Sequence, residues 1–95
     1  MIIDFDPAKS AKNDTDRGLP FELVEDFDWD GGLFAEDLRN TYPERRFEAI
    51  GPIADRLFVL VFTPIVGGVR VISFRKANPR EVKRYEQAQD KQDRE

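Results

Sequence analysis

Three segments in the second half of the chain have the apolar pattern of β-strands: residues 46–50, 57–63 and 69–74. The first and the third alternate between apolar and polar positions, as half-exposed strands do, while the second is a continuous apolar run that predicts a central strand. In the third, strict alternation places Arg70, Ile72 and Phe74 on one face. Turns rich in glycine and proline separate the segments, so we expect an antiparallel meander.

The first half predicts a short strand over residues 2–5 and then a helix. Asp6 and Pro7 suit the N-cap and the first position of this helix. It should end near Arg17, because Gly18 fits the left-handed position that commonly follows a helix.

Two short segments lie between that helix and the meander. A second short helix is predicted from Pro20, where the apolar residues Phe21, Val24 and Phe27 recur every three positions. Residues 33–38 fit either a short edge strand or a loop.

The last segment predicts a helix that begins with a capping box. Asn78 suits the N-cap, Pro79 the first helical position, and Glu81 the position whose carboxylate reaches back to the cap. Residues 87–95 have no apolar face, so we expect this charged tail to fray or stay disordered. The predicted fold is α+β, with a single domain over residues 1–86. Its antiparallel sheet has about four to five strands, with two N-terminal helices and one C-terminal helix.

Charge is divided unevenly along this chain, whose net charge is −4. Residues 1–44 hold 12 acidic and 4 basic side chains, whereas residues 45–86 hold 9 basic and 4 acidic ones. The two parts could neutralise each other, with Arg75 and Lys76 paired to acidic residues, or the basic part could bind a polyanion. The basic residues concentrate where the last strand meets the last helix, and RNA is the polyanion that we expect there.

The composition excludes several kinds of chemistry. The chain has no cysteine and no histidine, so it has no disulfide, no thiolate nucleophile and no histidine base. Asp26, Asp28 and Asp30 precede two glycines, but the bidentate glutamate of a calcium loop is missing at the required distance. We therefore expect no metal and no cofactor. The longest apolar run is too short to cross a bilayer and the N-terminus has no signal-peptide pattern, so we expect a cytoplasmic protein without membrane contact.

Three motifs in a fixed order resemble those of one family. They are Phe5-Asp6-Pro7-Ala8-Lys9 with Gly18 and Phe21, then Glu44-Arg45-Arg46-Phe47-Glu48-Ala49-Ile50-Gly51, then Val69-Arg70-Val71-Ile72-Ser73-Phe74-Arg75-Lys76-Ala77. Over residues 4–86 the chain resembles the BrnT-type toxins, the ribonuclease half of a bacterial type II toxin–antitoxin pair. The resemblance implies a RelE-like fold, inhibition of translation, and a BrnA-like antitoxin with a ribbon-helix-helix DNA-binding part. It also implies an RNA substrate, the ribosome as a possible partner, and DNA contact only through the antitoxin.

Metal-independent RNA cleavage uses the ribose 2′-hydroxyl as the nucleophile, so the enzyme must remove its proton and stabilise the charge that develops on the phosphate. Arginine suits the second task because its planar fork binds two phosphate oxygens. The candidates for catalysis are Arg46, Arg75, Lys76, Glu81, Arg84 and Tyr85, and those for RNA binding are Lys12, Arg17, Arg70 and Arg80. We expect the guanidinium groups of the carboxy-terminal half to converge into one open hollow. Glu48 and Glu81 are alternative proton acceptors, and the capping box is a structural alternative for Glu81.

One position departs from the family pattern. Members usually carry Lys-His-Gly at the end of the first helix, where this chain has Asp16-Arg17-Gly18. Two functions therefore stay open: a toxin endoribonuclease, or a catalytically weakened toxin that serves as an antitoxin-binding co-repressor. Growth arrest on expression without an antitoxin would distinguish them.

Overall fold

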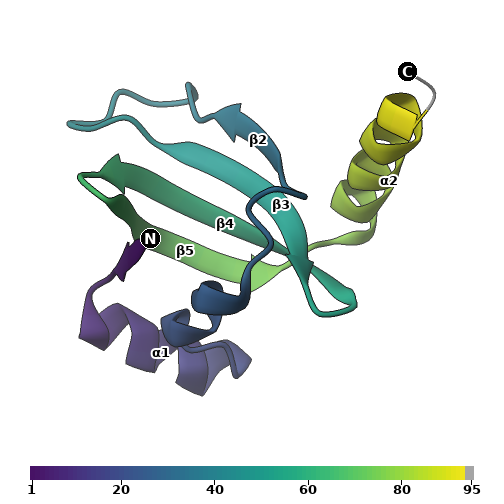
Figure 1. Ribbon diagram of the computed structural model, residues 1–95. Helices are drawn as coiled ribbons and strands as arrows, with labels where there is room; N and C mark the ends of the chain where they lie inside the picture. The colour runs from purple at the N-terminus through teal and green to yellow at the C-terminus, as the bar shows by residue number, and fades with distance from the viewer. Residues whose placement is uncertain (94–95) are drawn as a thin grey trace.

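The fold is one sheet with two helical elements between its first and second strands in the chain and a third after its last strand (Figure 1). The computed structural model describes residues 1–93. Its elements are β1 (Ile2–Asp4), α1 (Pro7–Arg17), η1 (Phe21–Asp26), β2 (Leu33–Glu36), β3 (Phe47–Ile53), β4 (Arg56–Ile65), β5 (Gly68–Lys76) and α2 (Pro79–Asp93). The α+β class predicted from the sequence is confirmed.

The strands lie in the order β1-β5-β4-β3-β2. The predicted meander of β3, β4 and β5 is confirmed, and the ambiguous segment after residue 32 forms the antiparallel edge strand β2. β1 instead pairs with β5 in parallel. The sheet is therefore mixed, and the expectation of a wholly antiparallel sheet is wrong. Local sequence patterns do not reveal this pair, because its two strands are far apart in the chain.

A bulge interrupts the alternation of β5. Val71 lies opposite Phe62 and Ser73 lies opposite Val61, so Ile72 is an extra residue without a partner in β4. One extra residue in a strand exchanges the faces toward which the following side chains point. Val71 and Phe74 therefore both face the core, and the expectation that Arg70 and Phe74 share a face is wrong.

α1 and η1 cover one face of the sheet (Figure 1). Phe21, Val24 and Phe27 pack there against Leu60 and Phe74, and each of these five residues is at most 4 % exposed. η1 is a 3₁₀-helix, so the second predicted helix exists with three residues per turn. This geometry suits apolar residues that recur at every third position.

Both α-helices begin as predicted. Asp6 caps α1 by accepting a hydrogen bond from the Ala8 N–H, and Gly18 ends it with φ of 69°. At α2 the capping box is complete. The Glu81 N–H donates to Asn78 Oδ1 and the Asn78 N–H donates to Glu81 Oε1, each over 2.9 Å.

α2 continues to Asp93, beyond the boundary near residue 86 that the apolar pattern predicts. Residues 87–93 include three glutamines, one alanine and one lysine, and the helix propensity of these residues sustains a helix without an apolar face. Residues 94–95 of the predicted tail lie outside the described residues. In residues 1–93 no helix combines the length and the hydropathy that a membrane span requires.

Candidate active site

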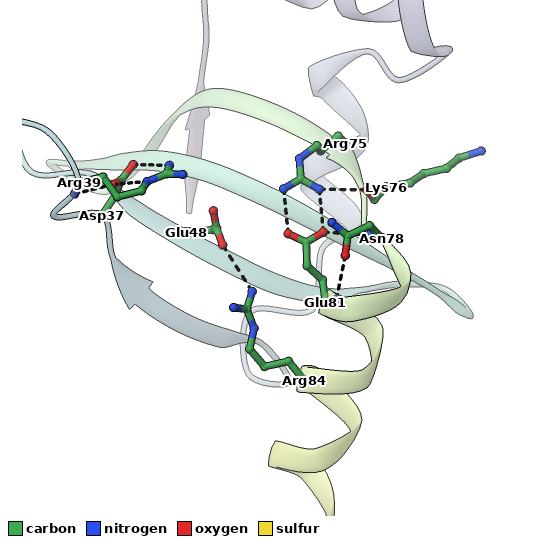
Figure 2. A network of polar contacts seen from close by, with 8 residues as sticks. All are labelled: Asp37, Arg39, Glu48, Arg75, Lys76, Asn78, Glu81 and Arg84. Carbon is green, nitrogen blue, oxygen red and sulfur yellow. Dashed lines mark hydrogen bonds and ion pairs between the residues drawn. The ribbon is translucent and has the colours of Figure 1, made fainter.

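The sheet face opposite α1 and η1 carries a glutamate, Glu48 of β3. Its neighbours Phe47 and Ala49 pack in the core, so the alternation of the strand directs the Glu48 side chain to the other face. That side chain is 28 % exposed. Figure 2 shows it between Arg39, Arg75 and Arg84. One carboxylate therefore lies among three arginines that come from three different parts of the fold.

Arg84 of α2 reaches toward Glu48 from the side. Its Nη2 lies 3.9 Å from Glu48 Oε1, and 58 % of the Arg84 side chain is exposed. A contact of this length and exposure is weak, so the guanidinium keeps donors available for another anion. A hollow of about 260 Å³, which Arg39, Glu48 and Arg84 line together with residues 35–38, opens beside the contact.

Arg75, near the end of β5, forms a two-pronged ion pair with Glu81 of α2. Arg75 Nη1 donates to Glu81 Oε1 over 2.7 Å, and Nη2 donates to Oε2 over 2.8 Å. Nη1 also lies 3.3 Å from the carbonyl oxygen of Lys76. Figure 2 shows this pair where β5 passes into α2. The geometry is the parallel fork that gives arginine–carboxylate pairs both strength and a fixed orientation.

The ion pair sets the charge state of both partners. The hydrogen bonds from Arg75 lower the pKa of the Glu81 carboxyl to about 2, against the opposing effect of burial, and the Asn78 N–H adds to the lowering. The bond with Glu81 likewise raises the pKa of Arg75, to which the charge of Glu48 contributes. Glu81 is therefore ionised at neutral pH, but both of its oxygens already accept hydrogen bonds. It is better suited to hold Arg75 than to accept a proton.

Arg39 lies in the connection after β2 and is held by Asp37. Arg39 Nε and Nη2 each lie 3.0 Å from an oxygen of Asp37, and the Tyr42 hydroxyl lies 3.2 Å from the same carboxylate. The bonds from Arg39 lower the pKa of Asp37 well below its ordinary value. The bond with Asp37 raises the pKa of Arg39, and Glu48 contributes through its charge. Asp37 thus fixes Arg39 beside the hollow that Glu48 lines.

Tyr85 connects α2 to the turn that precedes β2. Its hydroxyl donates to the carbonyl oxygen of Gly31 over 2.6 Å. Burial raises the pKa of this hydroxyl, so it is neutral at physiological pH. The bond restrains α2 one residue after Arg84, and it occupies the proton that a catalytic tyrosine would donate.

Other predicted residues lie elsewhere. The Arg46 guanidinium sits 4.2 Å from the centre of the Tyr42 ring and 3.6 Å from Glu44, in a separate hollow. Arg70 pairs with Asp4 over 2.9 Å, where β5 meets β1. The predicted convergence of all these arginines into one hollow is therefore wrong, because Arg46 lies beside Glu44 and Arg70 pairs with Asp4 at other places in the fold.

Two more predicted RNA-binding residues lie on the helices. Lys12 of α1 pairs with Asp16 over 3.0 Å, and Arg80 is exposed in the first turn of α2. In contrast, Arg17, Arg75 and Lys76 line one hollow with Leu19, at the outer edge of β5. The structure thus brings together three predicted residues from two elements that are distant in sequence.

The sequence analysis missed Arg39 and gave Glu48 too little weight. Arg39 lies in a polar connection without any pattern, and only the strand order brings it near Glu48. The sequence did contain a signal for Glu48, which is a single acidic residue between the apolar residues Phe47 and Ala49 of a predicted strand. Among residues 1–93, no group of three or more histidine, cysteine, aspartate or glutamate side chains is arranged to hold a metal ion.

These observations define a small α+β protein with an acid–arginine cluster on one sheet face. Residues 5–81 match the family model described as "Ribonuclease toxin, BrnT, of type II toxin-antitoxin system". The chain belongs to the BrnT family, which indicates a ribonuclease toxin that has an antitoxin partner. No curated protein and no solved structure shows a significant match to the chain.

Proposed function

We propose that this chain is a metal-independent toxin endoribonuclease and that its active site is the sheet face around Glu48. The observation that carries the proposal is the grouping of one partly buried carboxylate with Arg39, Arg75 and Arg84 beside an open hollow. Family membership supports the ribonuclease activity. Because the chain has no histidine and no cysteine, carboxylates are the natural proton acceptors at neutral pH.

In the proposed reaction, Glu48 removes the proton from a ribose 2′-hydroxyl, whose oxygen attacks the adjacent phosphorus. The new bond to the 2′-oxygen forms as the bond to the 5′-oxygen breaks. The products are a 2′,3′-cyclic phosphate and a 5′-hydroxyl. The 5′-oxygen takes its proton from solvent water, and Glu48 then returns to the solvent the proton that it removed. Arg84 and Arg75 donate to the non-bridging phosphate oxygens and stabilise the charge that develops there.

The remaining candidates take supporting roles in this scheme. Glu81 orients Arg75, and Tyr85 positions the turn of α2 that carries Arg84. Lys76 adds positive charge near the end of β5. The more distant cations contact RNA away from the cleaved linkage: Lys12, Arg46, Arg70 and Arg80.

The proposal extends to the setting of the activity. We assign the function to residues 1–86 and infer a RelE-like fold, a cytoplasmic location and inhibition of translation, with or without a ribosome. A BrnA-like antitoxin would neutralise the toxin by covering the hollow beside Glu48. Contact with DNA would then come only through the antitoxin.

A second function is favoured by one observation. Arg46, Arg75 and Arg84 each contact a carboxylate of this chain, which reduces the positive charge that is free for RNA. A weakened toxin that only binds its antitoxin and acts as a co-repressor would tolerate such pairing. Arg84 distinguishes the two functions best, because its contact of 3.9 Å is long enough for a phosphate to displace.

Expression in bacteria without an antitoxin tests the proposal. We expect the wild type to arrest growth, and Glu48→Gln or Arg84→Ala to abolish the arrest while antitoxin binding is retained. Arg56→Ala is the control, because it removes an exposed arginine at the start of β4 that does not line the hollow beside Glu48. A folded wild-type chain without any effect on growth would instead support the co-repressor.

A further inference from the structure

The hollow at the outer edge of β5 has a volume of about 380 Å³. Its lining consists of Arg17, Leu19, Arg75 and Lys76, so every charged side chain in the lining is a cation. The hollow shares no lining residue with the one beside Glu48. Arg75 lines it from the end of β5, and Figure 2 shows the same residue in the group around Glu48.

The open edge follows from the strand pairing. β1 pairs only with Gly68–Arg70, so the rest of the outer edge of β5 lacks a strand neighbour. Asn13 of α1 fills part of the gap by donating to the carbonyl oxygens of Phe74, over 3.0 Å, and Leu19, over 2.7 Å. Asn13 is only 7 % exposed. Its amide is therefore fixed in place by two hydrogen bonds in a buried position.

Asn13 in turn positions Arg17. Arg17 Nη1 donates to Asn13 Oδ1 over 2.7 Å, which satisfies the remaining acceptor of this amide. The partner is neutral, so the contact holds the guanidinium without cancelling its charge. Asp16, the adjacent acid, pairs with Lys12 instead.

The charges of Arg17 and Lys76 are uncompensated. Neither forms an ion pair with a carboxylate of the described residues, whereas six other arginines do: Arg39, Arg45, Arg46, Arg70, Arg75 and Arg84. Two unpaired cations beside a third in one hollow, on a chain with net charge −4, mark a place for an external anion.

We propose that this hollow binds a backbone phosphate of the RNA strand that flanks the cleaved linkage. The inference rests on the proposed function. Arg75 lines this hollow and lies in the same group of residues as Glu48 (Figure 2), so a strand held at Glu48 would continue past it. Arg17 supplies paired donors to the phosphate, and Lys76 adds a mobile point charge. Asn13 is a positioning residue that acts through Arg17. The hollow thus guides the strand, and the chemistry takes place on the other side of Arg75.

Binding of a short single-stranded 2′-O-methyl RNA, which lacks the attacking hydroxyl, tests the inference. Fluorescence anisotropy over a range of KCl concentrations would compare the wild type with the double variant Arg17→Gln, Lys76→Gln. We expect roughly tenfold weaker binding. The slope of log K against log salt should become shallower by about 0.7, since each neutralised phosphate of a single strand contributes about that much.

The matched control is the double variant Arg56→Gln, Lys91→Gln, which removes the same charges from exposed positions outside both hollows. It should keep the wild-type salt slope. An equal loss of slope in both double variants would overturn the subsite, because the effect would then be one of net charge. Thermal unfolding of each protein, and each single variant alone, separates charge removal from loss of folding.

The outcomes also separate this inference from the proposed function. If the Arg17, Lys76 variant binds like the wild type and still cleaves RNA, the subsite is wrong and the nuclease stands. If the wild type binds the oligonucleotide through Arg17 and Lys76 but never cleaves RNA, the subsite stands and the nuclease is wrong. If these two residues affect binding of a purified antitoxin and not of the oligonucleotide, the hollow serves a protein and the inference is overturned.

Discussion

Glu81 binds Arg75 through both carboxylate oxygens while it also accepts the N–H of Asn78 at the start of α2. A single carboxylate thus joins the end of β5 to the first turn of the following helix. Arg84 lies on the same helix, so its position over Glu48 depends on this junction. Stability and the geometry of the proposed active site are therefore linked through Glu81.

The first prediction concerns acid stability. The folded-state pKa of Glu81 is lowered to about 2, below the value expected in the unfolded chain, so the stabilisation is fully present at neutral pH. It should be lost as the pH falls from about 4.5 toward 2, at a cost of about 2 kcal/mol. Urea unfolding at several pH values would measure this loss.

Glu81→Gln is the comparison for that experiment, because glutamine cannot titrate. The variant should be less stable than the wild type at pH 7, and the difference between the two should shrink in acid. A constant difference across the acidic range would show that the ion pair contributes nothing through its charge.

The second prediction concerns the buried amide of Asn13. Asn13→Ala leaves the carbonyl oxygens of Leu19 and Phe74 without these donors, so we expect a loss of about 3 kcal/mol in the free energy of unfolding. Asp14→Ala, on the exposed side of the same helix, should change it by less than about 0.5 kcal/mol. Similar effects of the two substitutions would contradict this account of the β5 edge.

The third prediction separates an anchoring role of Tyr85 from a catalytic one. Tyr85→Phe removes the bond to the Gly31 carbonyl, which should cost about 1 kcal/mol of stability. If the hydroxyl only restrains α2, kcat should fall less than about tenfold, because the phenyl ring keeps the helix packed. A loss of kcat by several orders of magnitude, in a protein with normal stability, would assign the hydroxyl to proton transfer.

The fourth prediction tests Arg39, which the sequence patterns do not indicate. Arg39→Ala should lower kcat/KM for RNA by about tenfold, since one guanidinium beside the Glu48 hollow is lost. Arg56→Ala removes an exposed arginine at the start of β4, outside the lining of that hollow, and it should leave kcat/KM unchanged. Equal effects of the two variants would remove Arg39 from the proposed site.

Local sequence patterns predicted much of the fold. The caps at Asp6, Gly18 and Asn78 and the alternation in β3 depend on neighbouring residues, and the structure confirms them. The parallel pairing of β1 with β5 and the bulge at Ile72 depend on packing between distant segments. No local pattern encodes them, so the sequence did not predict them. The end of α2 was also predicted too early, because the helix continues to Asp93 without an apolar face.

The candidate site was less predictable, for the same reason. Arg75 and Glu81 are close in sequence, so the local sequence was enough to predict a capping box next to the basic end of a strand. Arg39, Glu48 and Arg84 come from three elements, and only the strand order and the course of α2 bring them together. The pairing of Arg46 with Glu44 and of Arg70 with Asp4 likewise required the structure.

The most direct test of the central claim is cleavage of a short RNA by the purified protein in the presence of a metal chelator. We predict that the wild type yields products with a 2′,3′-cyclic phosphate end and that Glu48→Gln lowers the rate by about 100-fold or more. An RNA with 2′-deoxyribose at the cleaved position should resist cleavage. Cleavage by Glu48→Gln at the wild-type rate would contradict the assignment of Glu48 as the base.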